Sequence, residues 1–375
     1  MKIIHIANFY GPKSGGIKTT LHNLGTEYGK IGYKFIYVVP GKSFSREETG
    51  HGGCITLPSW VIPFSGGYRV IKSNRQVKTI LNSLKPDRIE VSDRFTLSSL
   101  GNWAKKREIP AVVFSHETLR GLVKNYFGIS LKSFVGWHNS RLAGKFDFVV
   151  TTTEFAAAEF KEIGTSNVVQ VPLGVDLETF SPAHRNEELR AKMIKGGEVL
   201  LVHCGRLSPE KKPERSLQTL RELLNRGINA RLVYIGSGPL HKKLYDSSRD
   251  IPVTFWGYVA NKNLLAQMVA SADVSLAPGP IETFCLAALE SLASGTPVVA
   301  SETSAVGEFL SDDSGDFVGL TAANSGAAFA DAVEIILDEI KEDPSLSDRC
   351  RLQAEKFPWS ATIFKLDTMH PVKAA

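Results

Sequence analysis

Two cations in the second half of the chain have the residue types and spacing to bind phosphate. Arg206 and Lys211 lie in the segment GRLSPEK, directly after an apolar run that predicts a strand. An arginine contacts phosphate oxygens through its planar fork and a lysine acts as a point charge, so the pair suits a diphosphate. The simpler alternative for this segment is a solvated basic loop.

Two carboxylates follow further along, at Glu282 and Glu290. The residues between them predict a helix that begins near Thr283, with free N–H groups on Phe284 and Cys285 that suit a phosphate. On one continuous helix the two carboxylates would lie about 12 Å apart along the axis, at 1.5 Å per residue. They therefore suit hydrogen bonds to separate parts of an elongated ligand, although either could be an ordinary helix residue.

Three glycines and one histidine stand at other expected strand ends. Gly15 and Gly16 precede a predicted helix, where the backbone can approach an anion closely. The stretch is a near miss to the phosphate loop of NTPases, because Ile17 separates Gly16 from the following lysine. Gly236 belongs to a GxG pair that lacks the third glycine of the dinucleotide fingerprint. His116, at the end of AVVFSH, is either a catalytic group or an ordinary strand-end residue.

These residues must be held in place by folded domains, and the sequence predicts two of them. Its 375 residues, 43% of them hydrophobic, fit two or three globular domains at roughly 150 residues each. Near-continuous apolar runs alternate with amphipathic helical patterns in both halves, which is typical of parallel sheets covered on both faces. We therefore predict an α/β fold with two doubly wound, Rossmann-like domains facing a cleft, where such sheets bind ligands.

The domain boundary is expected in VPLGVDLETFSP, whose Pro and Gly residues interrupt both periodicities. This gives an N-terminal domain at 1–172 and a C-terminal domain at 173–357, with a last helix at about 358–375 packing back on the first domain. No apolar run approaches the roughly 20 residues that span a bilayer. The four cysteines have no CxxC spacing, so neither a zinc site nor a disulfide framework is expected. We therefore expect a cytoplasmic protein.

The net charge of +5 conceals two opposite halves. Residues 1–175 contain 23 Lys and Arg against 12 Asp and Glu, whereas the remainder contains 21 against 27. The basic half indicates an anionic partner, either nucleic acid or a membrane, and no nucleic-acid-binding motif accompanies it. Four cations spaced by three, near Trp60 and Phe64, predict a basic amphipathic helix that lies on anionic lipid, or else a solvated helix face. These cations are Arg69, Lys72, Arg75 and Lys78.

Together, GRLSPEK, ETFCLAALE, PLGVDLETFSP and the Gly-Gly loop resemble the retaining glycosyltransferases of family 4, over essentially the whole chain. Within that family, IANFYGPKSGG, IPFSGGYR and EVSDRFTLSSLG look most like the actinobacterial PimC-type mannosyltransferases that act on phosphatidylinositol mannosides. The resemblance implies the GT-B fold, a nucleotide-sugar donor that is GDP-mannose, and a glycolipid acceptor. It also implies peripheral binding at the inner face of the plasma membrane, with no nucleic acid as partner.

The resemblance also implies roles for the residues above. Glu282 would contact the sugar hydroxyls, Glu290 the ribose, and His116 would lie near the transferred sugar. The catalytic residues would be His116, Arg206, Lys211 and Glu282. The nucleotide-sugar-binding residues would be Gly15, Gly16, Arg206, Lys211, Gly236, Glu282, Phe284, Cys285 and Glu290.

The same resemblance bears on mechanism. The sequence contains no DxD motif, so no metal ion or other cofactor is expected. No carboxylate is evident as a nucleophile, and attack on the same face as the departing phosphate is therefore favoured. Two alternatives stay open at this point: a nucleotide-sugar epimerase of the same architecture and a non-catalytic nucleotide-sugar-binding protein.

Overall fold

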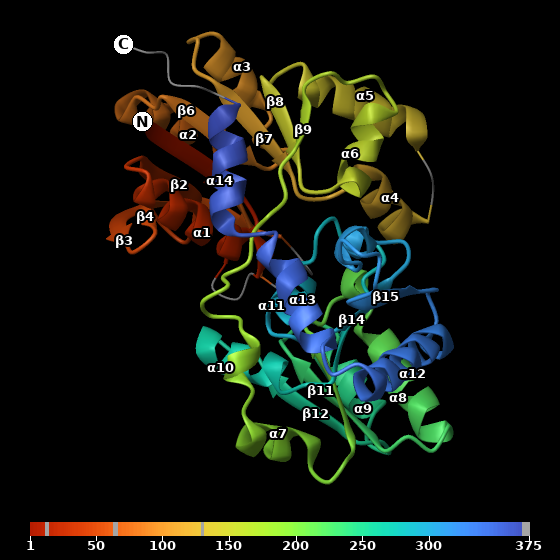
Figure 1. The fold of residues 1–375 in the computed structure, drawn as a ribbon. Coiled ribbons are helices and arrows are strands. Elements are labelled where there is room, and N and C mark those ends of the chain that lie inside the picture. The colour runs from red at the N-terminus through yellow and green to blue at the C-terminus, as the bar shows by residue number, and fades with distance from the viewer. Residues whose placement is uncertain (12–14, 63–66, 129–130, 370–375) are drawn as a thin grey trace. The chain divides into compact units, whose positions relative to one another are not determined.

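The chain forms two compact units (Figure 1). The first contains Met1–Leu173 and the C-terminal segment that starts at Trp359, and the second contains Gly174–Pro358. The computed structural model describes residues 1–11, 15–62, 67–128 and 131–369.

The first unit is built on a mainly parallel sheet with the strand order β3-β4-β2-β1-β6-β7-β8-β9. Its strands are β1 (Lys2–Ala7), β2 (Lys34–Gly41), β3 (Ser45–Thr49), β4 (Gly52–Val61), β5 (Arg69–Ile71), β6 (Arg88–Ser92), β7 (Ala111–Ser115), β8 (Phe148–Thr151) and β9 (Val168–Gln170). Its helices are α1 (Gly16–Lys30), α2 (Asn74–Leu84), α3 (Ser99–Lys105), α4 (Leu119–Phe127), α5 (Lys132–Ala143), α6 (Glu154–Lys161) and α14 (Trp359–Thr368). Strands β3 and β5 run antiparallel to β4 at one edge of the sheet. The apolar runs in the sequence did not predict these two strands.

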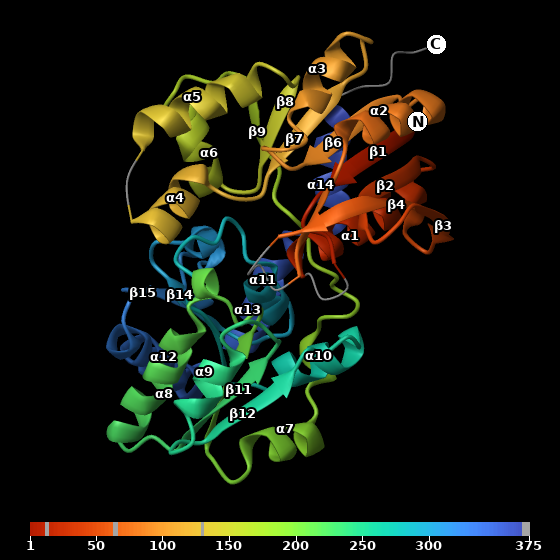
Figure 2. The same cartoon turned by 180° about the vertical axis from the view of Figure 1, so that it is seen from behind.

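Helices cover both faces of this sheet, which confirms the predicted α/β class. On one face Ile4 and Ile6 of β1 share a buried core with residues of α2, α3, α5 and α6, and Figure 2 shows α2 and α3 over that face. On the other face the predicted positions Leu21, Leu24 and Tyr28 of α1 are buried. Strand β1 is buried along nearly its whole length, as expected for a strand covered by helices on both faces.

The last helix, α14, belongs to the first unit and packs against α1. The Tyr33 hydroxyl donates to Asp367 Oδ1 at 2.8 Å, and the buried Arg88 donates to the Leu366 carbonyl at 3.0 Å. The Thr362 hydroxyl donates to the Pro172 carbonyl at 2.9 Å. These bonds join the C-terminal helix to residues from the first half of the chain.

The second unit contains a parallel sheet with the order β12-β11-β10-β13-β14-β15. Its strands are β10 (Val199–Cys204), β11 (Ala230–Ile235), β12 (Val253–Gly257), β13 (Val274–Ala277), β14 (Val298–Ser301) and β15 (Gly319–Ala322). Its helices are α7 (Glu187–Ile194), α8 (Pro213–Asn225), α9 (His241–Asp246), α10 (Lys262–Ala270), α11 (Leu286–Ala293), α12 (Gly326–Glu342) and α13 (Leu346–Glu355). The order reverses at β10 and β13, and the loops after these two strands carry the predicted phosphate-binding residues.

The predicted basic helix is wrong in its first half. Arg69 lies in β5, paired with Val61, because the β-branched residues Val70 and Ile71 extend the chain beside β4. Helix α2 begins only at Asn74, where the Ser73 hydroxyl accepts a hydrogen bond from the Gln76 N–H. Arg75 and Lys78 alone are therefore helical.

The four cations nevertheless lie on one continuous segment, which consists of β5, the turn after it and the start of α2. Lys72 lies in the turn, with its ammonium 4.4 Å from the centre of the Trp60 ring. Trp60 is exposed, whereas Phe64 lies outside the described residues. Within the described part of the chain, no helix combines the length and apolar character needed to cross a bilayer.

Candidate functional site

Lys211 and Glu282, far apart in the sequence, form an ion pair at the carboxyl end of the second sheet. The Lys211 ammonium donates to Glu282 Oε1 at 2.5 Å. Burial alone would lower the pKa of Lys211, but the Glu282 carboxylate raises it above its ordinary value. The lysine is therefore fully charged, and its partner is a carboxylate that a phosphate could replace.

The loop that presents Glu282 is fixed by buried groups. Arg215 of α8 donates from Nη1 to the Pro278 carbonyl at 2.6 Å, and the Ala305 N–H donates to the Glu282 carbonyl at 2.9 Å. A Cβ atom at Gly279 would lie 2.7 Å from Glu282 Oε1, so a larger residue there would displace this carboxylate from its present position. Arg215 lies in no sequence motif and was not among the predicted site residues.

The helix after Glu282 starts later than predicted. Helix α11 begins at Leu286, and Cys285 precedes it with a left-handed φ of 69°. The Phe284 side chain is buried against Phe309 and Phe357. Phe284 and Cys285 are therefore not first-turn helix residues. The turn that places the Phe284 ring in the core includes Cys285, and α11 therefore begins only at Leu286.

Because Glu282 is not on α11, the separation calculated along one helix does not describe the two glutamates. Glu290 lies on α11 near Lys262 and Asp176, whose charges act on it in opposite directions. Burial is the largest effect and raises the pKa of Glu290 to about 7. A half-protonated carboxyl group near neutral pH can accept hydrogen bonds from a diol such as a ribose.

Arg206 lies half-buried in the loop after β10, and the Ser208 N–H donates to its carbonyl at 3.0 Å. Behind this loop, a Cβ atom at Gly236 would lie 1.9 Å from the Gly205 carbonyl oxygen. The glycine at 236 is therefore required for the close packing of two strand-end loops. That packing explains Gly236 whether or not its backbone also contacts a ligand.

His203 is a further residue that the sequence analysis did not select. It lies near the end of β10, with Nδ1 2.9 Å from the Ser216 hydroxyl. Burial and then the Lys211 charge lower its pKa to about 3, so the imidazole is neutral beside the charged lysine. The position of His203 near the end of the predicted strand VLLVHC is the sequence feature that could have marked it as a site residue.

In the first unit, His116 stands at the end of a buried hydrogen-bonded chain. Its Nε2 lies 2.7 Å from the Ser92 hydroxyl, which lies 2.7 Å from Nε2 of His5. Nδ1 of His5 lies 2.9 Å from Glu90 Oε2. Burial would raise the pKa of Glu90, but Arg88 and His5 lower it to about 2, so a carboxylate ends the chain.

This hydrogen-bonded chain holds the His116 ring, which is neutral near pH 7. Burial, followed by the effect of His5, lowers the pKa of His116 to about 4, and the ring is neutral near pH 7. The hydrogen bond with Ser92 fixes the position of Nε2 of His116, and the His5 and Glu90 side chains in turn hold Ser92 in place.

Gly15 and Gly16 also belong to the first unit, at the start of α1. Both are exposed, and the Thr19 N–H donates to the Gly15 carbonyl at 3.0 Å. A Cβ atom at either glycine would meet no atom of the structure within 4 Å. Packing among the described residues therefore does not account for this pair of glycines. Across the same described residues, no cluster of three or more His, Cys, Asp or Glu side chains is arranged to hold a metal ion.

Comparisons with known proteins identify the family of the chain. Residues 14–179 match the family model described as Glycosyltransferase Family 4, and residues 198–339 match the model described as Glycosyl transferases group 1. A GDP-mannose-dependent alpha-(1-6)-phosphatidylinositol dimannoside mannosyltransferase from Mycobacterium tuberculosis is 44% identical over 362 residues. The match covers 96% of this chain and 93% of that protein.

Solved structures share the fold of the whole chain. A sucrose-phosphate synthase from Thermosynechococcus elongatus has a TM-score of 0.77 at 18% identity, covering 98% of each chain. Anabaena HepE in complex with UDP-glucose has a TM-score of 0.75 at 15% identity, covering 98% of this chain and 99% of its own. These likenesses confirm the expected GT-B fold of two Rossmann-like domains. With the long match at 44% identity, they lead to one assignment: the chain is a glycosyltransferase and belongs to glycosyltransferase family 4.

Proposed function

We propose that this glycosyltransferase moves mannose from GDP-mannose to a phosphatidylinositol mannoside, with retention of configuration and without a metal ion. The observation that carries the proposal is the 44% identity, over nearly the whole chain, to the mycobacterial enzyme named for this donor and acceptor. The family assignment favours transfer over the epimerase and sensor alternatives.

The donor is assigned to the second unit. Lys211 and Arg206 contact the diphosphate, and binding exchanges the Lys211–Glu282 pair for a Lys211–phosphate pair. Glu282 is then available to accept hydrogen bonds from sugar hydroxyls. Glu290 accepts the ribose hydroxyls from α11. The backbone near Cys285 lies beside these groups and contacts the phosphates.

The reaction breaks the bond between the anomeric carbon and the phosphate oxygen of GDP-mannose. The acceptor hydroxyl forms the new bond on the same face of the sugar, and its proton passes to the departing phosphate, which leaves as GDP. Cations and N–H groups fixed in advance at the developing negative charge give the largest catalytic effect of this kind. Arg206 and Lys211 supply that charge, and His116 positions the sugar through one of its hydroxyls.

The acceptor is a lipid, and the first unit supplies the membrane contact. Lys72 lies over the exposed Trp60 ring, and Arg69 and Arg75 lie three residues before and after Lys72 in the chain. Cations near an anionic surface contribute about 1 kcal/mol each, and tryptophan prefers the interface. Lys78 continues this surface on α2.

Calorimetric titration with GDP, UDP and ADP, each with and without EDTA, tests the donor and the metal. We expect GDP to bind most tightly and EDTA to leave its affinity unchanged. Tighter binding of UDP or ADP would contradict GDP-mannose as donor, and loss of affinity in EDTA would contradict metal-free binding.

A radiolabelled transfer assay tests the acceptor. Label from GDP-mannose should enter the lipid phase only when a phosphatidylinositol mannoside is added. Donor consumption at the same rate without the lipid would contradict transfer to that acceptor.

A further inference from the structure

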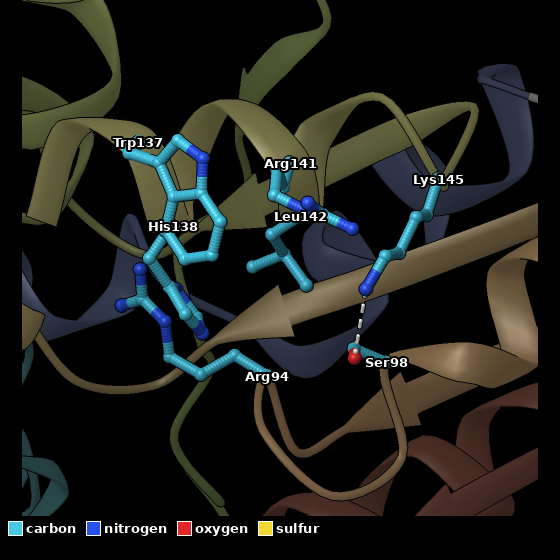
Figure 3. A pocket seen from close by; sticks show the side chains of 7 residues that line it. All are labelled: Arg94, Ser98, Trp137, His138, Arg141, Leu142 and Lys145. Atoms are coloured by element: carbon cyan, nitrogen blue, oxygen red, sulfur yellow. Dashed lines mark hydrogen bonds between the residues drawn. The ribbon is translucent and has the colours of Figure 1, made fainter. Parts of the chain in front are cut away.

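The first unit contains a cationic pocket that the proposed function does not use. It has a volume of about 250 Å³ and lies between α5 and the loop that follows β6. Figure 3 shows the side chains from these two segments around one space. Six of the residues that line it are polar or aromatic: Arg94, Ser98, Trp137, His138, Arg141 and Lys145. The volume is below the roughly 300 Å³ at which pockets for drug-sized ligands begin, so the pocket suits a small group rather than a nucleotide-sugar.

The charges in this pocket are unequally compensated. No acidic residue lines it, and Arg94 pairs with the buried Glu159 at 2.8 Å behind it. Arg141 stacks over the Trp137 ring at 5.0 Å, and Lys145 donates to the Ser98 hydroxyl at 3.1 Å. Among the described residues, neither of these two cations has a carboxylate partner. The pocket therefore attracts an anion.

Buried polar atoms at the pocket also lack partners. Within the described structure, Nε of Arg94 and Nδ1 of His138 are buried and make no hydrogen bond. The Arg94 side chain is only 4% exposed. Buried polar atoms are usually paired in native proteins, so these two atoms add to the case for a hydrogen-bonding ligand here. Burial and the Arg94 charge lower the pKa of His138, and an anion here would oppose that effect.

Exposed aromatic side chains surround the mouth of the pocket. Trp137 is 55% exposed, Phe134 next to it is 50% exposed, and Phe95 on the opposite loop is 40% exposed. Phe134 and Trp137 lie on the same helix as Arg141. Aromatic rings beside cations are typical of surfaces that enter the polar layer of a membrane.

We propose that this pocket binds the phosphodiester group of an anionic phospholipid, while Trp137 and Phe134 enter the interfacial layer. The lipid held here anchors the enzyme and is not the sugar acceptor. The proposal rests on the proposed function only in that the enzyme works at a membrane. It adds a second membrane contact, formed by α5 and separate in sequence from β5 and α2.

Vesicle co-sedimentation of the full chain tests the proposal. The double variant Arg141→Gln/Lys145→Gln should bind phosphatidylcholine vesicles containing phosphatidylinositol at least about tenfold more weakly, given the contribution of each cation near an anionic surface. The matched control is Lys105→Gln/Lys106→Gln, which removes the same charge from exposed positions at the end of α3. Equal weakening in both variants, or no weakening in the first, would overturn the proposal.

Quenching by brominated phosphatidylcholine tests the aromatic contact. Trp137→Phe should remove part of the quenching on vesicles, and Trp60→Phe reports separately on the β4–β5 surface. Quenching that is unchanged in Trp137→Phe would overturn the proposal. So would equally tight binding of free glycerophosphate, because the site would then bind a free phosphate.

Transfer to a water-soluble, deacylated acceptor separates this proposal from the proposed function. The Arg141→Gln/Lys145→Gln variant should transfer mannose to that acceptor at the wild-type rate. Failure of the wild-type enzyme to transfer would contradict the proposed function, whereas the vesicle results would still decide the pocket.

Discussion

At the scale of single residues, Lys211 carries the most specific expectation, because its charge is partly buried and its partner is a carboxylate. Lys211→Ala and Arg206→Ala should each lower kcat by about a hundredfold or more, the usual loss when one stabilising donor is removed. Lys243→Ala, at an exposed position of α9, is the control. Kinetics close to wild type in the first two variants would show that GRLSPEK is a surface loop without a role in the reaction.

Ser92 holds the His116 ring through the hydrogen bond to Nε2, and it is not assigned to any ligand. Ser92→Ala removes the hydroxyl between two imidazoles, and each buried Nε2 then loses its partner there. We expect kcat to fall about tenfold, since an unpaired buried polar group costs about 1–3 kcal/mol. The KM for GDP-mannose should change little.

A rescue experiment separates positioning from stability. Ser92→Thr keeps the hydroxyl and should restore most of the rate that Ser92→Ala loses. If Ser92→Ala lowers the melting temperature but leaves kcat and its pH profile unchanged, the serine is only structural.

Glu290 should make nucleotide binding depend on pH. Its pKa of about 7 lies above the value of 4.5 for an exposed glutamate, so it gains a proton as the pH falls from 8 to 6. The protonated form accepts ribose hydroxyls less well, and guanosine affinity should fall in that range. Guanosine is the probe because it has no phosphate that titrates there.

The raised pKa of Glu290 also makes the stability of the folded protein depend on pH. The folded state holds the proton of Glu290 more tightly than the unfolded state, so stability is lost as the pH rises from 4.5 through 7. Glu290→Gln should remove this loss and flatten the affinity profile. A profile in Glu290→Gln that matches wild type would assign the titration to another group.

At the scale of elements, the loop before Glu282 depends on α8. Arg215→Met removes the bond to the Pro278 carbonyl and should lower kcat about tenfold, because a buried charged hydrogen bond is worth about 1.5–3 kcal/mol. Arg221→Met on the same helix removes an exposed ion pair with Asp250 and is the control. Equal kinetics of the two variants would show that the loop holds its shape without Arg215.

Most central strands and helix α1 followed from the sequence, whereas the strands at the sheet edges and the starts of α2 and α11 did not. Strand β1 and helix α1 were predicted because their apolar residues repeat with one clear period. Strand β5 was assigned to a helix because Arg69 and Lys72 fitted the spacing of the cations on α2. Its strand character comes from pairing with β4, and a local pattern carries no information about a partner.

At the scale of the molecule, the second unit is continuous in sequence and has its own buried core. Residues 174–358 expressed alone should fold and bind GDP within about a factor of ten of the full chain, as an independent domain would. They should not sediment with anionic vesicles, because acidic residues outnumber basic ones after residue 175. Vesicle binding by this piece would contradict the assignment of the membrane contact to the first unit.

The first unit, in contrast, needs the far end of the chain. Truncation after Pro358 removes α14 and exposes the surface that buries Ile363 and Leu366. Each such side chain contributes about 1.5–3 kcal/mol, so the melting temperature of the first unit should fall by several degrees. Differential scanning calorimetry with GDP, which shifts only the second unit, identifies the transition. An unchanged first transition would show that α14 is dispensable.

The sequence by itself determined the α/β class, and it predicted the linker segment and two loops as candidates for binding phosphate, because each of these depends on residue types at short spacing. Only the tertiary structure paired Lys211 with Glu282, joined Glu90, His5, Ser92 and His116, and gathered the cations of the α5 pocket. Each of these contacts joins side chains brought together by strand order or by helix packing against the sheet. The periodicity of one segment does not encode its neighbours in the sheet, and the burial that shifts the pKa of His116 and Glu290 comes from those neighbours.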